Sequence, residues 1–491
     1  MNVWDACISK LIYIYIILER YIIYYTKNDD IMNYSPQMQL NACQYCNGPL
    51  TYIPQYNQWY CYRCNVYTLP PQVQQPAVQP QPPVAKHQYF PQPAEKPPPP
   101  KQKRKVFPII ATAFVVIMLV LAVYAYTVLY KPPDENDMVT INDVSKIREL
   151  DVLQDVPVMY LTEDELRQDI IQSLEPEDYE EMEELRLVMD ALFLLDYEEN
   201  LTQIILDAYS SQILGFYKPE EKEVWLVEGH ASIMDRVILS HEFTHALQDQ
   251  HFNLTAFEKG ADSEEDAARE AVVEGDASLT ENIYKDTLST SEKREYNKEI
   301  SKIVGSSVYI PEMVLRLMYF PYLYGEEFVE EIYDDGGWDE VNKLYYDPPV
   351  STEQIMHIEK YHQREEPVSV SFDKNVQGMD LVFEEIMGEY TLYVMLVNYI
   401  SESDAADAAE GWGGDKYYYY KNDTDYLSVL KITWDTTGEA SEFYSIYQDY
   451  MDALPTKYQG IINEDRLRIN INQKVTTIYH SSDSDIIDQV E

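Results

Sequence analysis

Residues 107–130 form a long uncharged stretch, FPIIATAFVVIMLVLAVYAYTVLY. A helix of this length spans ~36 Å, more than the ~30 Å hydrocarbon core of a bilayer. The stretch therefore predicts a transmembrane helix over 106–130. The basic segment 101–105, KQKRK, precedes it, whereas acidic residues follow it. By the positive-inside rule we expect a single-pass protein of the cell membrane, with a cytoplasmic N-terminus and an extracellular C-terminal domain.

Charge divides the chain at the same place. Residues 1–130 contain ten Lys and Arg against five Asp and Glu, a net charge of +5, whereas residues 131–491 carry −53. So acidic a surface argues against nucleic acid as a partner. The five cysteines all lie in the first part, so the acidic part contains no disulfide.

Two C-x-x-C pairs predict a zinc ribbon over residues 41–68. Cys43 and Cys46 are separated by 14 residues from Cys61 and Cys64. Four thiolates at this spacing bind one structural Zn²⁺ and leave no open coordination position. We expect two short strands, 50–53 and 58–60, around a turn, and a structural role or a cytoplasmic protein partner for the ribbon. The alternative, a redox pair of C-x-x-C motifs, lacks a surrounding βαβ pattern.

The remaining segments before the apolar stretch carry weaker signals. Residues 1–40 are apolar in part, but Glu19 and Arg20 interrupt the run, which is too short and polar for a second span. Residues 69–105 are rich in proline and end in the basic segment, which is typical of an extended linker. Residues 131–480 are then left as the acidic domain.

The strongest chemical signal in that domain is His241-Glu242-Phe243-Thr244-His245. On a helix, expected here over about 231–250, histidines four residues apart lie on one face and reach a single ion. In H-E-x-x-H sites this ion is zinc, and the glutamate acts as general base toward a zinc-bound water. A catalytic zinc needs a third protein ligand and keeps one position open for water.

The third ligand is expected in the segment 262–281, DSEEDAAREAVVEGDASLTE, which reads as a helix. Its alanines let a second helix approach closely, and Glu274 lies among them. Glu270, one turn earlier, faces the same way and is the rival ligand. A solvated acidic helix face is the alternative without a metal.

Other elements are expected around this centre. Thr162 and Glu165 form a capping box that starts a helix. Hydrophobic spacing predicts a helix over about 178–195, and residues 213–217 and 223–227 read as a hairpin that could bind substrate by strand addition. The tyrosine run 417–420 is expected to form a strand with one solvent-exposed face.

Four blocks of the domain carry a resemblance to known proteins. They are Gly215-Phe216-Tyr217-Lys218-Pro219, His241 to Phe252, Glu274-Gly275-Asp276-Ala277, and Pro348 to Tyr361. Residues 150–455 resemble gluzincin metallopeptidases and are similar to an uncharacterised prokaryotic surface or lipoprotein peptidase-like family. The resemblance implies zinc held by the two histidines and a downstream glutamate. It supplies no substrate, and it extends to a block at 411–417 without a chemical role.

Taken together, the expected fold class is α+β: a mainly helical, zincin-like peptidase ectodomain with a small β-sheet, a small β zinc ribbon and one transmembrane helix. His357, within the last of the four blocks, has two readings. A histidine beside a zinc site can donate to the oxyanion, which makes His357 a candidate catalytic residue. The structural reading, capping or packing after the turn at 351–354, is favoured because no spacing ties His357 to the metal.

The sequence thus predicts a membrane-anchored zinc metalloprotease acting on proteins or peptides, with one catalytic and one structural Zn²⁺. Zinc on His241, His245 and Glu274 would lower the pKa of a bound water, and Glu242 would move its proton to the leaving amine. One alternative is a catalytically silent receptor or adhesion ectodomain that signals through the ribbon. Another is a zinc hydrolase of non-peptide substrates.

Overall fold

The described residues fall into two compact units, one that contains the strands between 51 and 68 and one over 138–491. The computed structural model describes residues 51–53, 58–61, 66–68 and 138–491, apart from 175, 196–199, 305–309, 373 and 375. The acidic domain expected over 131–480 lies within the second unit, whose described residues run to Glu491, and its bounds stay a prediction.

The smaller unit contains a three-stranded antiparallel sheet in the order β1-β2-β3, formed by β1 (Thr51–Ile53), β2 (Gln58–Cys61) and β3 (Val66–Thr68). The two strands expected around the turn are confirmed as β1 and β2, and β3 is an addition. Cys61 ends β2, whereas Cys43, Cys46 and Cys64 lie outside the described residues. The four-cysteine zinc site stays a prediction.

The expected fold class requires one correction. No helix among the described residues is long and apolar enough to cross a membrane. The long helices α8 (Ser232–Phe252), α10 (Ser263–Thr287) and α12 (Glu312–Gly336) each contain acidic and basic side chains, which a bilayer core excludes. The stretch 106–130 lies outside the described residues. Over the described residues, the structure supports a mixed fold of helices and β-sheets in which no helix could cross a membrane.

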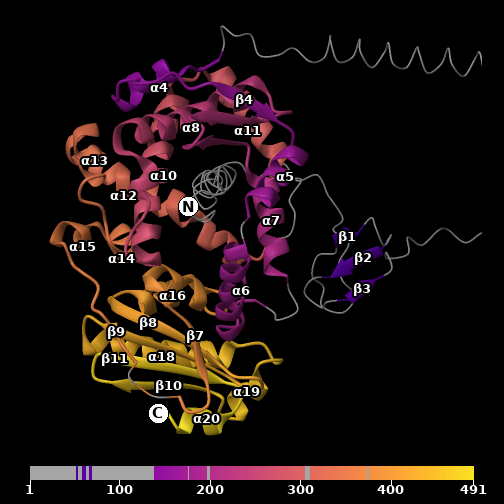
Figure 1. The fold of residues 1–491 in the computed structure, drawn as a ribbon, viewed down its shortest axis with the longest axis vertical. Helices are drawn as coiled ribbons and strands as arrows, with labels where there is room; N and C mark the ends of the chain where they lie inside the picture. Colours follow the sequence, from indigo (N-terminus) through magenta and orange to yellow (C-terminus); the bar gives the residue numbers. More distant parts are fainter. Residues whose placement is uncertain are drawn as a thin grey trace, which may run out of the picture. The chain divides into compact units, whose positions relative to one another are not determined.

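The larger unit begins with a helical segment and a small sheet (Figure 1). The sheet has the order β4-β6-β5, with β4 parallel to β6 and β5 antiparallel to it, so the expected hairpin is confirmed. The capping box of Thr162 and Glu165 is present at the start of α5. The elements are α4 (Ile141–Arg148), β4 (Val158–Leu161), α5 (Glu163–Ser173), α6 (Pro176–Ala191), α7 (Leu201–Gln212), β5 (Gly215–Lys218) and β6 (Glu223–Val227).

Three long helices form the centre of the unit (Figure 1). α8 and α10 confirm the two helices expected around the histidine motif and Glu274, and α10 packs against both α8 and α12. The hairpin lies directly on α8, because a Cβ at Gly215 would be 2.4 Å from the Ile238 side chain. The helices that complete this region are α9 (Leu254–Phe257), α11 (Thr290–Val304), α13 (Trp338–Leu344), α14 (Thr352–Met356) and α15 (Ile358–Gln363).

A five-stranded antiparallel sheet in the order β10-β11-β9-β8-β7 forms the C-terminal part (Figure 1). The strands are β7 (Asp380–Glu385), β8 (Trp412–Lys421), β9 (Tyr426–Trp434), β10 (Leu467–Asn472) and β11 (Val475–Ser481). The helices are α16 (Gly388–Val397), α17 (Glu402–Ala409), α18 (Thr437–Ala453), α19 (Gln459–Asn463) and α20 (Ser484–Asp488). α18 packs against β9, β10 and β11.

The tyrosine run 417–420 lies in β8, as expected. The prediction that one face of this strand is exposed to solvent is wrong. All four rings are buried. Tyr417 and Tyr419 belong to the main core, whereas Tyr418 and Tyr420 pack into a second cluster with Ile487 of α20. Both faces of the strand are therefore covered, and the phenol rings alternate between two cores.

The block at 411–417 also has a structural explanation. Asp415 accepts hydrogen bonds from the backbone N–H groups of Met387 and Gly388, both at 2.9 Å, and from Trp412 Nε1 at 2.8 Å. These contacts fasten the first turn of α16 to β8. Gly388 at this junction has a φ of 74°, which favours glycine.

Candidate metal centre

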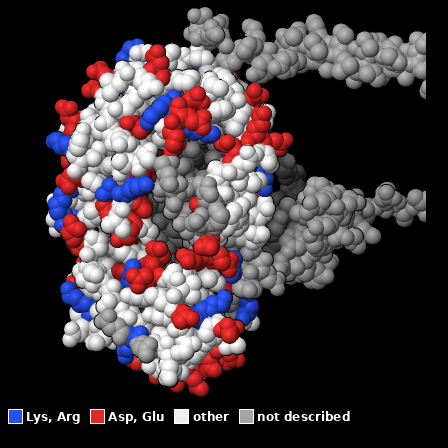
Figure 2. Space-filling view, in the orientation of Figure 1, with Lys and Arg blue, Asp and Glu red and all other residues white. Residues whose placement is uncertain are grey.

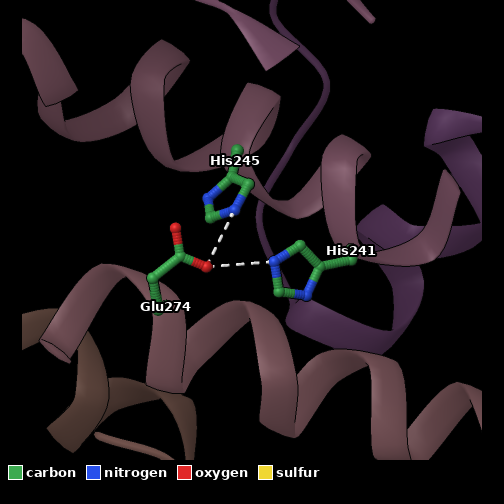
Figure 3. Close-up of side chains that lie close together, drawn as sticks. All are labelled: His241, His245 and Glu274. Carbon is green, nitrogen blue, oxygen red and sulfur yellow. Dashed lines mark hydrogen bonds and ion pairs between the residues drawn. The ribbon is translucent and has the colours of Figure 1, made fainter. Parts of the chain in front are cut away.

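His241, His245 and Glu274 converge where α8 and α10 pack together (Figure 3). Glu274 Oε2 lies 3.1 Å from His241 Nε2 and 3.4 Å from His245 Nε2. The three candidate ligand atoms lie within 4.8 Å of one another. All three residues are buried, and Glu274 is 0% exposed. Glu274, rather than Glu270, is thus the glutamate that the structure brings to the two histidines.

Each imidazole also has a polar neighbour at Nδ1, the ring nitrogen that does not face Glu274. His245 Nδ1 lies 2.9 Å from Gln248 Oε1, and Gln248 Nε2 donates to the Val273 carbonyl oxygen at 2.9 Å. Because an amide oxygen only accepts, this contact places the proton of a neutral His245 on Nδ1 and leaves the Nε2 lone pair toward Glu274. Such partners orient metal-binding histidines in known sites.

A carboxylate lies near Nδ1 of the other histidine, as an ion-pair contact. His241 Nδ1 lies 3.4 Å from Glu281 Oε2, and Glu281 also pairs with Lys285 Nζ at 2.7 Å. Sequence reasoning missed both Gln248 and Glu281. Their signal was helical spacing: Gln248 is three residues after His245, and Glu281 is two turns after Glu274.

The buried carboxylates make the centre attractive to positive charge. Burial acts to lower the pKa of His241, but Glu274 and Glu281 outweigh it and raise the pKa to about 10. Burial likewise opposes ionisation of Glu274, but the two histidines outweigh it and lower the Glu274 pKa. Without a metal, protons on the histidines balance the negative charge of these carboxylates. A divalent cation bound between the same side chains would balance that charge as well.

Three consecutive residues of α10 each face a different neighbour. Glu274 faces α8, whereas Gly275 faces α12, where a Cβ would lie 2.1 Å from the Gly325 carbonyl oxygen. Asp276 pairs with Arg148 of α4. The small residues were expected to admit α8, which stays a prediction. The backbone of α10 also approaches α12 closely, since a Cβ at Gly325 would be 2.2 Å from the Ala271 carbonyl oxygen.

This approach brings Tyr322 of α12 to the centre. Its ring is stacked on the His241 ring, with centroids 6.1 Å apart and an interplanar angle of 11°. Burial, and then the charges of Glu274 and Glu270, raise the pKa of Tyr322 well above its ordinary value. The phenol therefore stays protonated at neutral pH, and its O–H is a hydrogen-bond donor beside the carboxylates of the centre. No sequence signal separated Tyr322 from the other tyrosines of α12.

Glu242 is buried beside the centre, 6% exposed, and its charge contributes to raising the pKa of both histidines. Its place next to His241 on α8 is that of the expected general base, a role that stays a prediction. The donor set itself fits zinc, which takes two imidazole nitrogens and a carboxylate oxygen in catalytic sites. Moreover, apart from its 3.4 Å ion-pair contact with Glu274, His245 Nε2 is buried without a hydrogen-bond partner among the described residues.

His357 lies elsewhere, at the junction of α14 and α15. Its Nε2 is 2.8 Å from Glu389 Oε1 of α16, and His357 is not one of the three residues of the cluster. The hydrogen bond to Glu389, followed by other nearby carboxylates, raises the pKa of His357 although burial opposes this. A catalytic role for His357 stays a prediction, and the contacts that it makes join two helices.

A second group of carboxylates, Glu353, Glu365 and Asp435, also has the spacing of a metal site. Here the cation is already supplied by the chain. Lys360 Nζ lies 3.1 Å from Glu353 and 2.7 Å from Glu365, and it also contacts Asp435. Lys360 explains the proximity of the three groups: it forms ion pairs with Glu365 and Asp435 and contacts the Glu353 carboxyl, which burial keeps largely protonated because it raises the Glu353 pKa to about 8.

One family model matches the chain, and its description is a domain of unknown function, DUF8575, over residues 377–491. This segment contains the five-stranded sheet and lies after every residue of the histidine and glutamate cluster. No match was found among curated proteins or among solved structures. The resemblance to gluzincin peptidases therefore rests on the sequence blocks alone.

Proposed function

We propose that this protein is a zinc metallopeptidase in which His241, His245 and Glu274 bind the catalytic ion. One observation carries the proposal: two buried imidazoles direct their Nε2 atoms at one buried carboxylate oxygen, while Nδ1 of His245 is hydrogen-bonded to Gln248 and Nδ1 of His241 lies 3.4 Å from Glu281. A pair of solvated helix histidines would need neither Gln248 nor Glu281. Three such protein ligands leave a coordination position for water, as a catalytic zinc requires.

The residues around the centre suit hydrolysis. When bound, zinc lowers the pKa of water toward ~7 and polarises a carbonyl group. Glu242 then accepts the proton of the attacking water and delivers it to the leaving amine. Tyr322, which is protonated at neutral pH, donates to the oxygen on which negative charge develops. Proteins or peptides are the substrates that this chemistry favours, in line with the sequence blocks.

Glu242 gives the first test. The change Glu242→Gln removes the base but no metal ligand, so zinc content should stay at the wild-type value while peptide cleavage falls by ~100-fold or more. The measurement is zinc content by mass spectrometry alongside cleavage of a casein or peptide library, with and without chelator. Glu228→Gln, an exposed carboxylate ahead of α8, is the matched control. An unaltered rate in Glu242→Gln would remove Glu242 from the reaction.

A further inference from the structure

Arg148 of α4 and Asp276 of α10 form an ion pair that is entirely removed from solvent. Both side chains are 0% exposed. Arg148 Nε donates to Asp276 Oδ1 at 2.5 Å, and Nη2 donates to Oδ2 at 2.9 Å. The planar guanidinium group thus holds the carboxylate by two parallel bonds, which fix direction as well as distance.

Neighbouring groups restrict the pair further. Tyr345 donates to Asp276 Oδ2 at 2.7 Å, and Arg148 Nη2 also donates to Asn342 Oδ1 at 2.7 Å. The guanidinium carbon lies 4.3 Å from the centre of the Trp338 ring. α4, α10 and α13 therefore meet at one buried charge pair.

Stability does not explain such a pair. Removing both charges from water is costly, and apolar side chains of similar volume often pack as well or better. What the pair adds is a defined orientation. Asp276 follows Glu274 by two residues, about 200° around the helix, so the pair holds the side of α10 that faces away from the metal centre. Site residues need placement within about 0.5 Å and 10–20°.

We propose that Arg148 and Asp276 are positioning residues, which fix the rotation of α10 about its axis and so direct Glu274 at His241 and His245. The inference rests on the proposed function, because it concerns the same zinc ion. α4 carries no ligand, yet it becomes a supporting element of the metal centre. Gly275, between the two acidic residues, sets the distance to α12, whereas Asp276 sets the rotation.

The test replaces the pair by apolar side chains in the full chain, as Arg148→Met/Asp276→Leu. Co²⁺ is titrated into the metal-free protein, because thiolate charge-transfer absorption identifies ions on the ribbon cysteines and separates them from ions on histidine. We expect a folded variant that melts within a few degrees of the wild type. Its affinity at the histidine site should fall by about 10- to 100-fold, the effect typical of residues behind the ligands, and its Co²⁺ ligand-field spectrum should change.

Two controls complete the test. Phe443→Leu removes core volume under the five-stranded sheet, so it should lower the melting temperature and leave Co²⁺ affinity unchanged. If the double variant does not fold, Arg148→Lys keeps the charge but loses the two-pronged contact, and its affinity should still fall. A folded variant with wild-type affinity and spectrum would overturn the positioning role alone. A wild-type chain that binds Co²⁺ no better than His241→Ala would overturn the zinc site, and this inference with it.

Discussion

At the scale of single residues, the segment after the histidine motif consists of side chains with separate tasks. Gln248 orients the second histidine. Asp249 accepts from Tyr217 Oη of the hairpin at 2.8 Å and also pairs with Lys222. Gln250 accepts from the backbone of the loop before β4, at 2.7 Å from the Leu153 nitrogen. The sequence block therefore encodes both the centre and its attachment to the surrounding elements.

The prediction at this scale concerns Tyr322. Tyr322→Phe removes the phenol O–H, which also bonds Glu274, but keeps the ring on His241, so zinc affinity should fall by no more than the about 10- to 100-fold expected for a residue behind the ligands. Loss of one donor to a developing oxyanion typically reduces kcat by about 100- to 1,000-fold. Steady-state kinetics of the zinc-loaded protein measure this effect, with Tyr324→Phe on the same helix as the control. Equal kcat values for wild type and Tyr322→Phe would remove the phenol from the reaction.

At the scale of elements, local patterns sufficed where one periodicity dominated. The hairpin, the capping box at Thr162 and the two helices α8 and α10 followed from spacing and turn residues alone. What the sequence could not supply was the partner of each face. The sequence does not show whether α8 or α12 packs against Ala271. The tyrosine strand is predicted to be half-exposed because the sequence does not show that α20 covers its second face. Tyr322 becomes visible only once α12 is known to pack against α10, whereas Glu281 could have been found from its helical spacing to Glu274.

The crossing of α10 and α12 gives the prediction for elements. A methyl group at Gly275 would lie 2.1 Å from backbone oxygen in α12, so Gly275→Ala must separate the helices. We expect a destabilisation of about 1 to 3 kcal/mol in denaturant unfolding and a loss of Tyr322 from its place on His241. Gly460→Ala is the control, because its Cβ would meet nothing within 4 Å. Wild-type stability in Gly275→Ala would contradict the close crossing.

At the scale of the whole unit, Asp and Glu far outnumber Lys and Arg, so several carboxyl groups share one basic side chain. Figure 2 shows Asp and Glu in several separate patches on a face that is mostly uncharged. Lys360 contacts three carboxyl groups. One of them belongs to Asp435, the residue after β9, so Lys360 links the α14–α15 region to the C-terminal sheet. Burial raises the pKa of Glu353 to about 8, although Lys360 opposes this shift.

This network predicts a pH-dependent stability. Because the folded-state pKa of Glu353 exceeds its ordinary value of 4.5, the Glu353 contribution to stability is complete below about pH 4.5 and is lost as pH rises to about 8. Glu353→Gln cannot ionise, so its melting temperature relative to wild type should rise by a few degrees between pH 5 and pH 9. Thermal melts across this range measure it. A difference that stays constant, or falls with pH, would show that Glu353 is ionised throughout.

The central claim is that Glu274 completes the zinc site, and metal content tests it most directly. Glu274→Ala removes a ligand, so zinc affinity at the histidine site should fall by far more than the about 10- to 100-fold expected for a residue behind the ligands. Glu270→Ala, one turn away on the same helix, should retain its zinc. The account predicts that Glu274→Ala purifies without the catalytic ion while Glu270→Ala keeps it, and the reverse result would contradict it.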